Sequence, residues 1–236
     1  MERILKVFKT GLLTACAMVC LQGVRAQDWP DLERFRGAND SLPAPAPDEN
    51  RVVFMGNSIT IGWLHKVPDF FEGKPYVNRG ISGQTTPQML LRFRQDVIAL
   101  KPKVVVILAG VNDIAGNTGP MTLDQIMDNL RSMAELALAN GIEPVLSSVL
   151  PAYDFPWRPG LEPAKKVPAL NEMIRSYAQA HDLVYLDYFT AMADDRPGLD
   201  KTLATDEVHP TVKGYQMMAP LCEAAIARAL EKHARR

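Results

Sequence analysis

Four short apolar runs, separated by segments with helical periodicity, limit the fold of this chain more than any other feature of the sequence. The runs are rich in β-branched residues and lie at 51–55, 103–109, 143–149 and 183–187, with a weaker one at 76–78. The helical patterns lie near 86–99, 122–140, 163–181 and 211–231. Strands that alternate with helices are typical of βαβ units, in which helices cover both faces of a parallel sheet. The sequence therefore predicts an α/β fold.

The run at 104–109 is apolar at every position, as expected of a central strand that helices cover on both sides. In open parallel sheets, ligands bind outside the carboxyl ends of the strands. Ser58 and Asn112 each follow an apolar run closely. We therefore expect both side chains at one edge of the sheet, where a site would form.

Residues 1–26 differ in kind from the rest of the chain. Basic residues precede the apolar stretch 11–21, and small residues stand close behind it. This pattern predicts a secretory signal peptide, so that the protein is exported to the periplasm or out of the cell. The stretch is about half of the roughly 20 residues that cross a bilayer, and no stable membrane insertion is predicted. Residues 13–16 also resemble a lipoprotein signal, which leaves a lipid tether as an alternative.

The rest of the chain is expected to hold an N-terminal helix and a proline-rich linker at 27–50, followed by one globular domain at 51–236. Apolar residues at helical spacing predict a helix within 28–42, which the prolines at 43–47 end. The chain is 47% hydrophobic and 22% charged, and this balance fits a single domain with a substantial core.

Charge and cysteine content exclude several classes of protein. Beyond residue 26 the chain carries 22 basic and 26 acidic residues and no basic cluster, so no nucleic-acid partner is predicted. Cys16 and Cys20 lie in the predicted signal peptide, which leaves Cys222 without a disulfide partner. Its apolar helical surroundings predict a buried structural thiol. The four histidines lack the spacing of metal ligands, and we expect no metal.

Ser58 is the candidate nucleophile, because it follows an apolar run and its hydroxyl would stand at the end of a strand. A serine hydroxyl needs a base at neutral pH, and histidine is the residue type suited to that task, which makes His209 the candidate. Asp206 precedes His209 by three residues, a spacing that lets one turn place the carboxylate beside the imidazole. An isolated surface pair is the alternative. The pair stands just before a predicted helix in a chain that also offers Ser58, and this favours the catalytic interpretation.

Acyl transfer also needs hydrogen-bond donors for the developing oxyanion. Gly83 lies in a loop, where the absence of a Cβ would let its backbone N–H approach a ligand. Asn112 follows a buried strand, and its side-chain amide could donate to the same ligand. The N–H of Ser58 would be a third donor. The alternatives are an ordinary loop glycine at 83 and a helix cap or turn residue at 112.

Four segments in this order, at 52–60, 81–85, 109–113 and 206–210, resemble the four sequence blocks of the SGNH (GDSL-like) hydrolases. The resemblance covers about residues 51–220. It implies a three-layer α/β/α, flavodoxin-like SGNH hydrolase fold with a central parallel sheet. It also implies chemistry that requires no cofactor.

The resemblance assigns roles to individual residues. It implies a catalytic triad of Ser58, Asp206 and His209. It implies an oxyanion hole formed by the N–H groups of Ser58 and Gly83 with the side chain of Asn112. One departure is Asn57, which stands where the family's name implies aspartate; since this residue is not the nucleophile, activity is still expected.

The function predicted from these features is that of a secreted serine esterase for small acyl esters. O-acetyl groups on carbohydrate are the first substrate expected, on the analogy of family members that act on decorated glycans. One alternative is a lysophospholipase or thioesterase, which the same site would serve if its cleft were long and apolar. Another is an inactive glycan-binding module. The oligomeric state is left open.

The loop at 151–163 and the residue Asp113 are the remaining features near the predicted site. The loop carries Tyr153, Phe155 and Trp157 after a predicted strand. It is expected either to line a substrate cleft or to pack its aromatic side chains against the body of the protein. Asp113, next to Asn112, is expected to cap or order its loop rather than to take part in catalysis.

Overall fold

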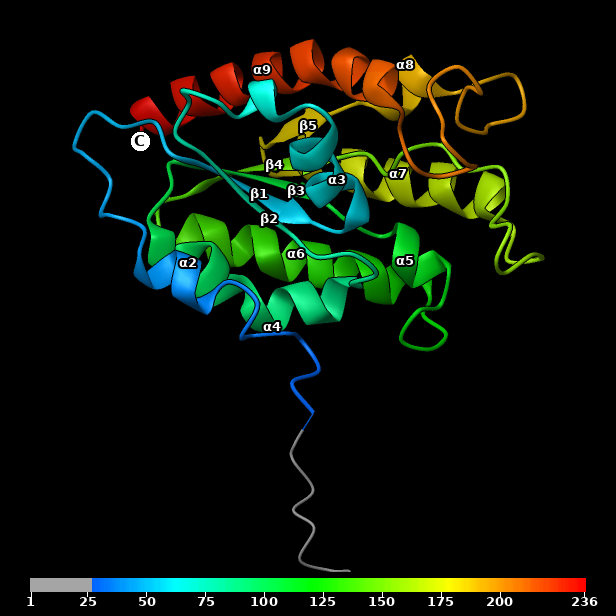
Figure 1. Cartoon of the computed structure of the whole chain (residues 1–236), viewed down its shortest axis with the longest axis horizontal. Coiled ribbons are helices and arrows are strands. Elements are labelled where there is room, and N and C mark those ends of the chain that lie inside the picture. The colour runs from blue at the N-terminus through cyan, green and yellow to red at the C-terminus, as the bar shows by residue number, and fades with distance from the viewer. Residues whose placement is uncertain (1–26) are drawn as a thin grey trace, which may run out of the picture.

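The computed structural model describes residues 27–236, and the signal peptide predicted at 1–26 lies outside the described residues. A five-stranded, all-parallel sheet forms the centre, in the order β2-β1-β3-β4-β5 (Figure 1). The strands are β1 (Val52–Gly56), β2 (Tyr76–Gly80), β3 (Val104–Leu108), β4 (Glu143–Ser147) and β5 (Val184–Leu186). The predicted parallel sheet, including its weaker strand, is confirmed.

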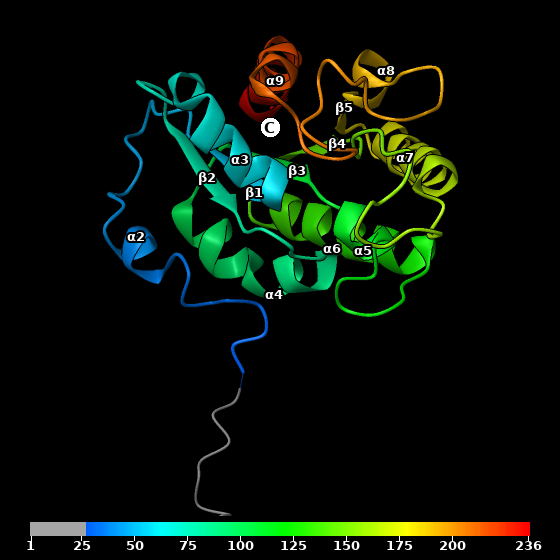
Figure 2. The same cartoon turned by 45° about the vertical axis from the view of Figure 1, so that its right-hand side comes forward.

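Helices cover both faces of the sheet and complete three layers (Figures 1 and 2). One face carries α3 (Ser58–Lys66) and α9 (Val212–Ala234). The other carries α4 (Thr86–Asp96), α6 (Leu123–Ala139) and α7 (Pro163–Ala180). Three short helices, α2 (Arg36–Asp40), α5 (Val111–Ile114) and α8 (Phe189–Met192), and two 3₁₀ turns, Pro68–Phe70 and Ile98–Leu100, lie in the connections. The predicted three-layer α/β/α fold is confirmed.

The helix α3 is absent from the pattern-based prediction. Its sequence mixes β-branched residues with Gly62, which weakens the helical signal. The helix begins because Asn57 caps it: the side-chain Oδ1 of Asn57 accepts a hydrogen bond from the N–H of Ile59 at 3.2 Å. It lies so close to β2 that a Cβ on Gly80 would come within 2.4 Å of the backbone nitrogen of Ile61. A glycine at position 80 is therefore required for this packing.

The register of the central strands decides which loops meet. Gly56 at the end of β1 pairs with Gly80 at the end of β2 and with Leu108 at the end of β3. All five residues of β3 are buried, as predicted for a strand covered on both sides. Because the three strands end level with one another, the segments that follow them emerge at the same edge of the sheet.

The N-terminal segment differs from its prediction. The helix expected within 28–42 is limited to α2, and residues 28–35 form turns instead. Asp31 has a positive φ of 57°, which no helix tolerates. Backbone carbonyls in this segment accept hydrogen bonds from glutamine side chains of α4 and of the loop before it, so the turns direct those carbonyls toward α4.

Cys222 is predicted to be a buried structural thiol, and the structure confirms its burial. Cys222 is fully buried in α9, and burial raises the pKa of its thiol to about 12. A thiol in this state is a packing residue and a poor nucleophile.

Within residues 27–236, no helix has the length and apolar character that crossing a membrane would take.

Glu143 opens β4 at the end of the sheet opposite the carboxyl edge. Its side chain is 1% exposed, and the Nε of Arg236 lies 3.3 Å from its Oε2. Burial raises the pKa of Glu143, and the positive charge of Arg236 offsets only part of that effect. The folded protein therefore disfavours the ionised carboxylate.

Replacing Glu143 with Gln is expected to raise Tm at pH 8. Because folding raises the pKa of Glu143, the native protein loses stability as pH rises from the unfolded pKa, about 4.3, through the folded one. The advantage of Glu143→Gln should therefore shrink at pH 4, which thermal unfolding at both pH values would measure. Glu231→Gln, at an exposed partner of Arg235, is the control and should change neither Tm. A native protein that is more stable than Glu143→Gln at pH 8 would contradict this account.

Candidate active site

Ser58 is the first residue of α3, and only Asn57 separates it from the end of β1. Its hydroxyl oxygen lies 3.0 Å from Nε2 of His209, which is 151 residues away in the chain. The Nδ1 of His209 lies 2.8 Å from Oδ2 of Asp206. An ionised carboxylate only accepts hydrogen bonds, so Nδ1 carries the ring proton and Nε2 is left to accept the proton of the serine hydroxyl. The three side chains thus form one directed series of hydrogen bonds.

The turn at 206–209 holds the carboxylate in place. The Oδ1 of Asp206 accepts hydrogen bonds from the backbone N–H groups of Val208 at 2.8 Å and His209 at 2.7 Å. Partial burial acts to raise the pKa of Asp206, but the hydrogen bonds from His209 and Val208 outweigh it and lower that pKa. The carboxylate therefore stays ionised at neutral pH, as a partner of an imidazole should.

Three groups at the same edge of the sheet have N–H protons to spare. Within residues 27–236, the backbone N–H groups of Ser58 and Gly83 donate to no protein atom. The side chain of Asn112 donates one proton to the carbonyl of Gln84 at 2.9 Å and keeps a second. Gly83 has a positive φ of 79°, so a glycine is favoured there by its backbone conformation as well as by its lack of a side chain. These are the three donors that the sequence predicts for an oxyanion.

The loops that carry Gly83 and Asn112 are joined to each other. Asp113, beside Asn112, accepts hydrogen bonds from the backbone N–H of Thr86 at 2.8 Å and from its hydroxyl at 2.6 Å. Asn117 donates to the carbonyl of Gly83 at 3.0 Å. Burial raises the pKa of Asp113, although the hydrogen bonds from Thr86 act against that shift. The structure therefore gives Asp113 the ordering contacts expected of it.

The loop after β4 reaches the same site. Phe155 is fully buried and packs against the body of the protein, while Tyr153 is 47% and Trp157 is 52% exposed. The ring centre of Trp157 lies 6.4 Å from that of His209. Arg158 holds the tip of the loop, because its Nη1 donates to the carbonyls of Ala115 at 2.8 Å and of Gly116 at 2.7 Å.

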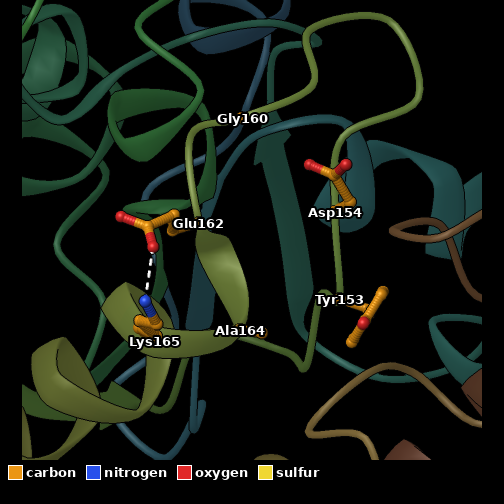
Figure 3. Close-up of a pocket in the computed structure, with 6 residues that line it drawn as sticks. All are labelled: Tyr153, Asp154, Gly160, Glu162, Ala164 and Lys165. Atoms are coloured by element: carbon orange, nitrogen blue, oxygen red, sulfur yellow. Dashed lines mark hydrogen bonds and ion pairs between the residues drawn. The ribbon is translucent and has the colours of Figure 1, made fainter.

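A hollow of about 340 Å³ lies within this loop and the start of α7 (Figure 3). It is lined by Tyr153, Asp154, Gly160, Glu162, Ala164 and Lys165. Glu162 and Lys165 form an exposed ion pair on one side of it, and Tyr153 lies across from them (Figure 3). The surface of this hollow thus combines an aromatic ring with charged and polar groups.

Sequence reasoning missed two residues beneath the site, Gln84 and Arg92. Both are buried, at 3% and 0% exposure, and they are hydrogen-bonded to each other. The only sequence signal for Arg92 is its place beside Phe93, on the stripe of α4 that faces the core. A charge on such a stripe indicates a buried partner, but the pattern does not say which one. In the described part of the chain, no group of three or more His, Cys, Asp or Glu side chains could hold a metal ion.

A parallel α/β/α sheet that carries a serine, an imidazole and a carboxylate in series at its carboxyl edge has the architecture of a serine hydrolase. The model of the GDSL-like lipase/acylhydrolase family matches residues 54–217. The chain belongs to this family, as its sequence predicts, and is thereby placed among the hydrolases of carboxylic esters.

Three similar proteins illustrate the relationship. A GDSL-like lipase from Bacteroides thetaiotaomicron has a crystal structure that matches with a TM-score of 0.83 and 46% identity, over 85% of this chain and 98% of that one. An acetylxylan esterase from Xylanibacter ruminicola is 28% identical over 79% of this chain and 45% of its own length. A lipoprotein named YqeF from Bacillus subtilis, described as uncharacterized, is 37% identical over 33% of each chain. This chain therefore spans less than half the length of either of these two curated relatives.

Replacing Asp113 with Ala is expected to lower the free energy of unfolding by about 2–3 kcal/mol. The variant would remove a buried acceptor and leave the N–H and hydroxyl of Thr86 without their partner. Urea denaturation followed by circular dichroism would measure the change. Asp128→Ala, which removes an exposed partner of Arg131, is the matched control and should stay within about 0.5 kcal/mol of the native protein. Equal losses in the two variants would show that Asp113 does not join the loops.

Proposed function

We propose that the protein is an exported serine esterase that removes small acyl groups, O-acetyl groups first, from carbohydrate. The observation that carries the proposal is the series of hydrogen bonds from Ser58 through His209 to Asp206, with distances of 3.0 and 2.8 Å. A hydroxyl, a general base and an orienting carboxylate in this order are what a serine mechanism needs.

In the proposed reaction, Nε2 of His209 takes the proton of Ser58 as its oxygen attacks the ester carbonyl carbon. The resulting oxyanion accepts hydrogen bonds from the N–H groups of Ser58 and Gly83 and from the amide of Asn112. His209 then gives its proton to the leaving alcohol, and the C–O bond breaks to leave an acyl-enzyme. In the second half, His209 takes a proton from water, the hydroxide attacks the acyl carbon, and Ser58 leaves with that proton as the acid is released.

A carbohydrate substrate is supported by the surface beside the base. Trp157 exposes half of its surface 6.4 Å from His209, and Tyr153 is exposed on the same loop. Aromatic rings of this kind offer an apolar face to a sugar ring while their polar edges remain in water. The acetylxylan esterase relative supports the acetyl group. Export is supported by the signal peptide predicted at 1–26 and by the lipoprotein relative, which also keeps a lipid tether open.

Two alternatives make different demands. A lysophospholipase or thioesterase would use the same three residues and would prefer long acyl chains. A glycan-binding module without catalysis would not need a serine, an imidazole and a carboxylate within hydrogen-bond distance of one another. This geometry favours an active enzyme.

Residues 27–236 are expected to hydrolyse p-nitrophenyl acetate faster than the butyrate and the butyrate faster than the octanoate. Ser58→Ala and His209→Ala should each lower kcat by about 10⁴-fold or more, because either change interrupts the proton transfer. Release of p-nitrophenol measures all of these rates. His65→Ala, at an exposed histidine of α3, is the control and should keep native kcat. Equal residual rates in the native protein and both variants would refute the esterase proposal, and a preference for octanoate would favour a lipase.

Replacing Trp157 with Ala should weaken the use of acetylated oligosaccharides without affecting a simple ester. Loss of the ring is expected to raise KM for an acetylated xylo-oligosaccharide about fivefold, the equivalent of about 1 kcal/mol. KM for ethyl acetate, which has no ring to stack, should not change; a pH-stat follows both reactions. Leu91→Ala, at an exposed residue of α4, is the control. An equal rise in KM for both substrates would contradict a sugar-binding role for Trp157.

A further inference from the structure

Gln84 is the residue in which the contacts beneath the site converge. It follows Gly83 directly, and its side chain and backbone are both engaged. The side-chain Oε1 accepts a hydrogen bond from Nε of Arg92 at 2.6 Å. The side-chain Nε2 donates to the carbonyl of Pro30 at 2.7 Å. The backbone carbonyl of Gln84 accepts the amide proton of Asn112 at 2.9 Å.

The chemistry of its partners leaves Gln84 only one orientation. The guanidinium of Arg92 can only donate, and the carbonyl of Pro30 can only accept. Turning the amide of Gln84 by 180° would place a donor against a donor and an acceptor against an acceptor. Because the side chain is 3% exposed, water is not at hand to relieve either conflict. The pair of partners therefore locks the side chain.

Asn112 is oriented through Gln84 in the same way. A carbonyl accepts and never donates, so the atom of Asn112 that faces the carbonyl of Gln84 is the amide nitrogen. One proton of that nitrogen is used in this contact, and the other remains for a substrate. The backbone of Gln84 thus sets the direction of the donor that Asn112 offers. Gly83, whose N–H is the second donor, is the residue immediately before Gln84 in the chain.

Arg92 connects this loop to the nucleophile. Its Nη2 donates to the carbonyl of Gly56 at 3.2 Å, two residues before Ser58. Its Nη1 pairs with Asp96 at 3.0 Å, so the positive charge of the buried guanidinium is balanced by a buried carboxylate. Separating such a pair would leave a buried charge without a partner, which costs much free energy. The ion pair with Asp96 therefore favours the position in which Arg92 contacts both Gln84 and Gly56. One side chain therefore spans the first and second loops of the site.

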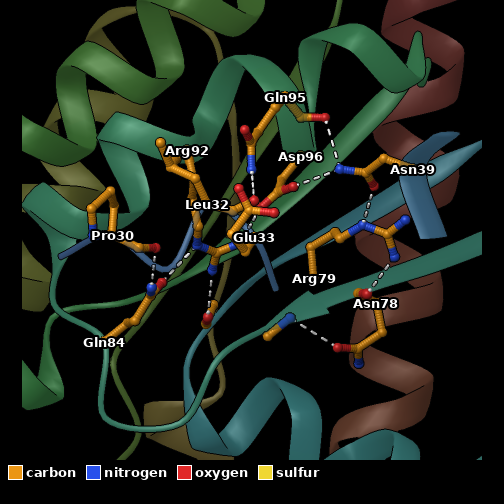
Figure 4. Close-up of polar contacts among 12 residues, drawn as sticks. Pro30, Leu32, Glu33, Asn39, Asn78, Arg79, Gln84, Arg92, Gln95 and Asp96 are labelled. Atoms are coloured by element: carbon orange, nitrogen blue, oxygen red, sulfur yellow. Dashed lines mark hydrogen bonds and ion pairs between the residues drawn. The ribbon is translucent and has the colours of Figure 1, made fainter. Parts of the chain in front are cut away.

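The N-terminal segment completes the network, as Figure 4 shows. Besides the contact of Pro30 with Gln84, the carbonyl of Leu32 accepts a hydrogen bond from Gln95 at 2.7 Å. Asn39 donates to Asp96 at 2.7 Å. Residues 29–39, which we term the N-terminal arm, are thus held along α4 by side chains of the main domain, and at Pro30 they touch the residue that orients Asn112.

We infer that Gln84 is a positioning residue for catalysis, held by Arg92 on one side and by the N-terminal arm on the other. It sets the amide of Asn112 and the N–H of Gly83 toward the oxyanion that forms at Ser58. This inference rests on the proposed esterase function. It adds that the segment directly after the predicted signal peptide supports the oxyanion hole rather than serving as a plain linker.

The test compares Gln84→Met, Gln84→Glu and Gln95→Met with the native protein, on p-nitrophenyl acetate. Gln84→Met loses both side-chain contacts and should lower kcat about 10- to 100-fold with KM within about threefold, because donors that act mainly in the transition state are displaced. Gln84→Glu keeps an acceptor for Arg92, loses the donor to Pro30 and should fall between the native protein and Gln84→Met. Gln95→Met loses one equivalent 2.7 Å contact to the arm, away from the site, and should keep native kcat.

The outcomes separate this inference from the proposed function. A native protein without esterase activity would refute the proposed function itself. An active native protein in which Gln84→Met and Gln95→Met have equal kcat would overturn only the role of Gln84. A rise in KM at unchanged kcat in Gln84→Met would also overturn it, since that pattern belongs to substrate binding. Thermal unfolding of each variant shows whether a fall in kcat occurs in a folded protein.

Discussion

The level ending of three parallel strands is the constraint on which the rest of this structure depends. Gly56 at the end of β1 lies opposite Gly80 at the end of β2 and Leu108 at the end of β3. The segments that follow these residues therefore lie close together. The chain then needs only local turns to present a hydroxyl, backbone N–H groups and an amide in one place. The imidazole comes from a fourth segment, before α9, and reaches the serine across 151 residues of sequence.

The residues that support the site are more deeply buried than the residues of the site itself. Ser58 and His209 are partly exposed, whereas Arg92, Asp96 and Asp113 are each at most 1% exposed. Hydrogen bonds in a dry interior are costly to break, and a site built above them is held with little freedom of movement. The arrangement places reactive groups in reach of water and the groups that hold them out of its reach.

The strands and long helices could be predicted because their signals are local. Apolar β-branched runs mark β1, β3, β4 and β5, whereas β2 contains Asn78 and Arg79, and its signal is correspondingly weak. The candidate triad could be predicted because its residues lie in recognisable segments. The N-terminal arm could not, since its turns are fixed by carbonyl contacts with residues more than 50 positions away. Gln84 and Arg92 were missed because a buried polar residue shows its role only through its partners, and Pro30 and Gly56 are 54 and 36 positions away from them.

The contacts that hold the arm depend on residue identity in the main domain more than in the arm. Trp29, Pro30 and Leu32 contribute main-chain carbonyls, which every amino acid possesses. The glutamines that grip them contribute side-chain amides, which few residues can replace. For these three contacts, the residue types that dock the arm are therefore those of the main domain. These three contacts therefore leave the side chains at positions 29, 30 and 32 free to vary, provided that the backbone keeps the same path.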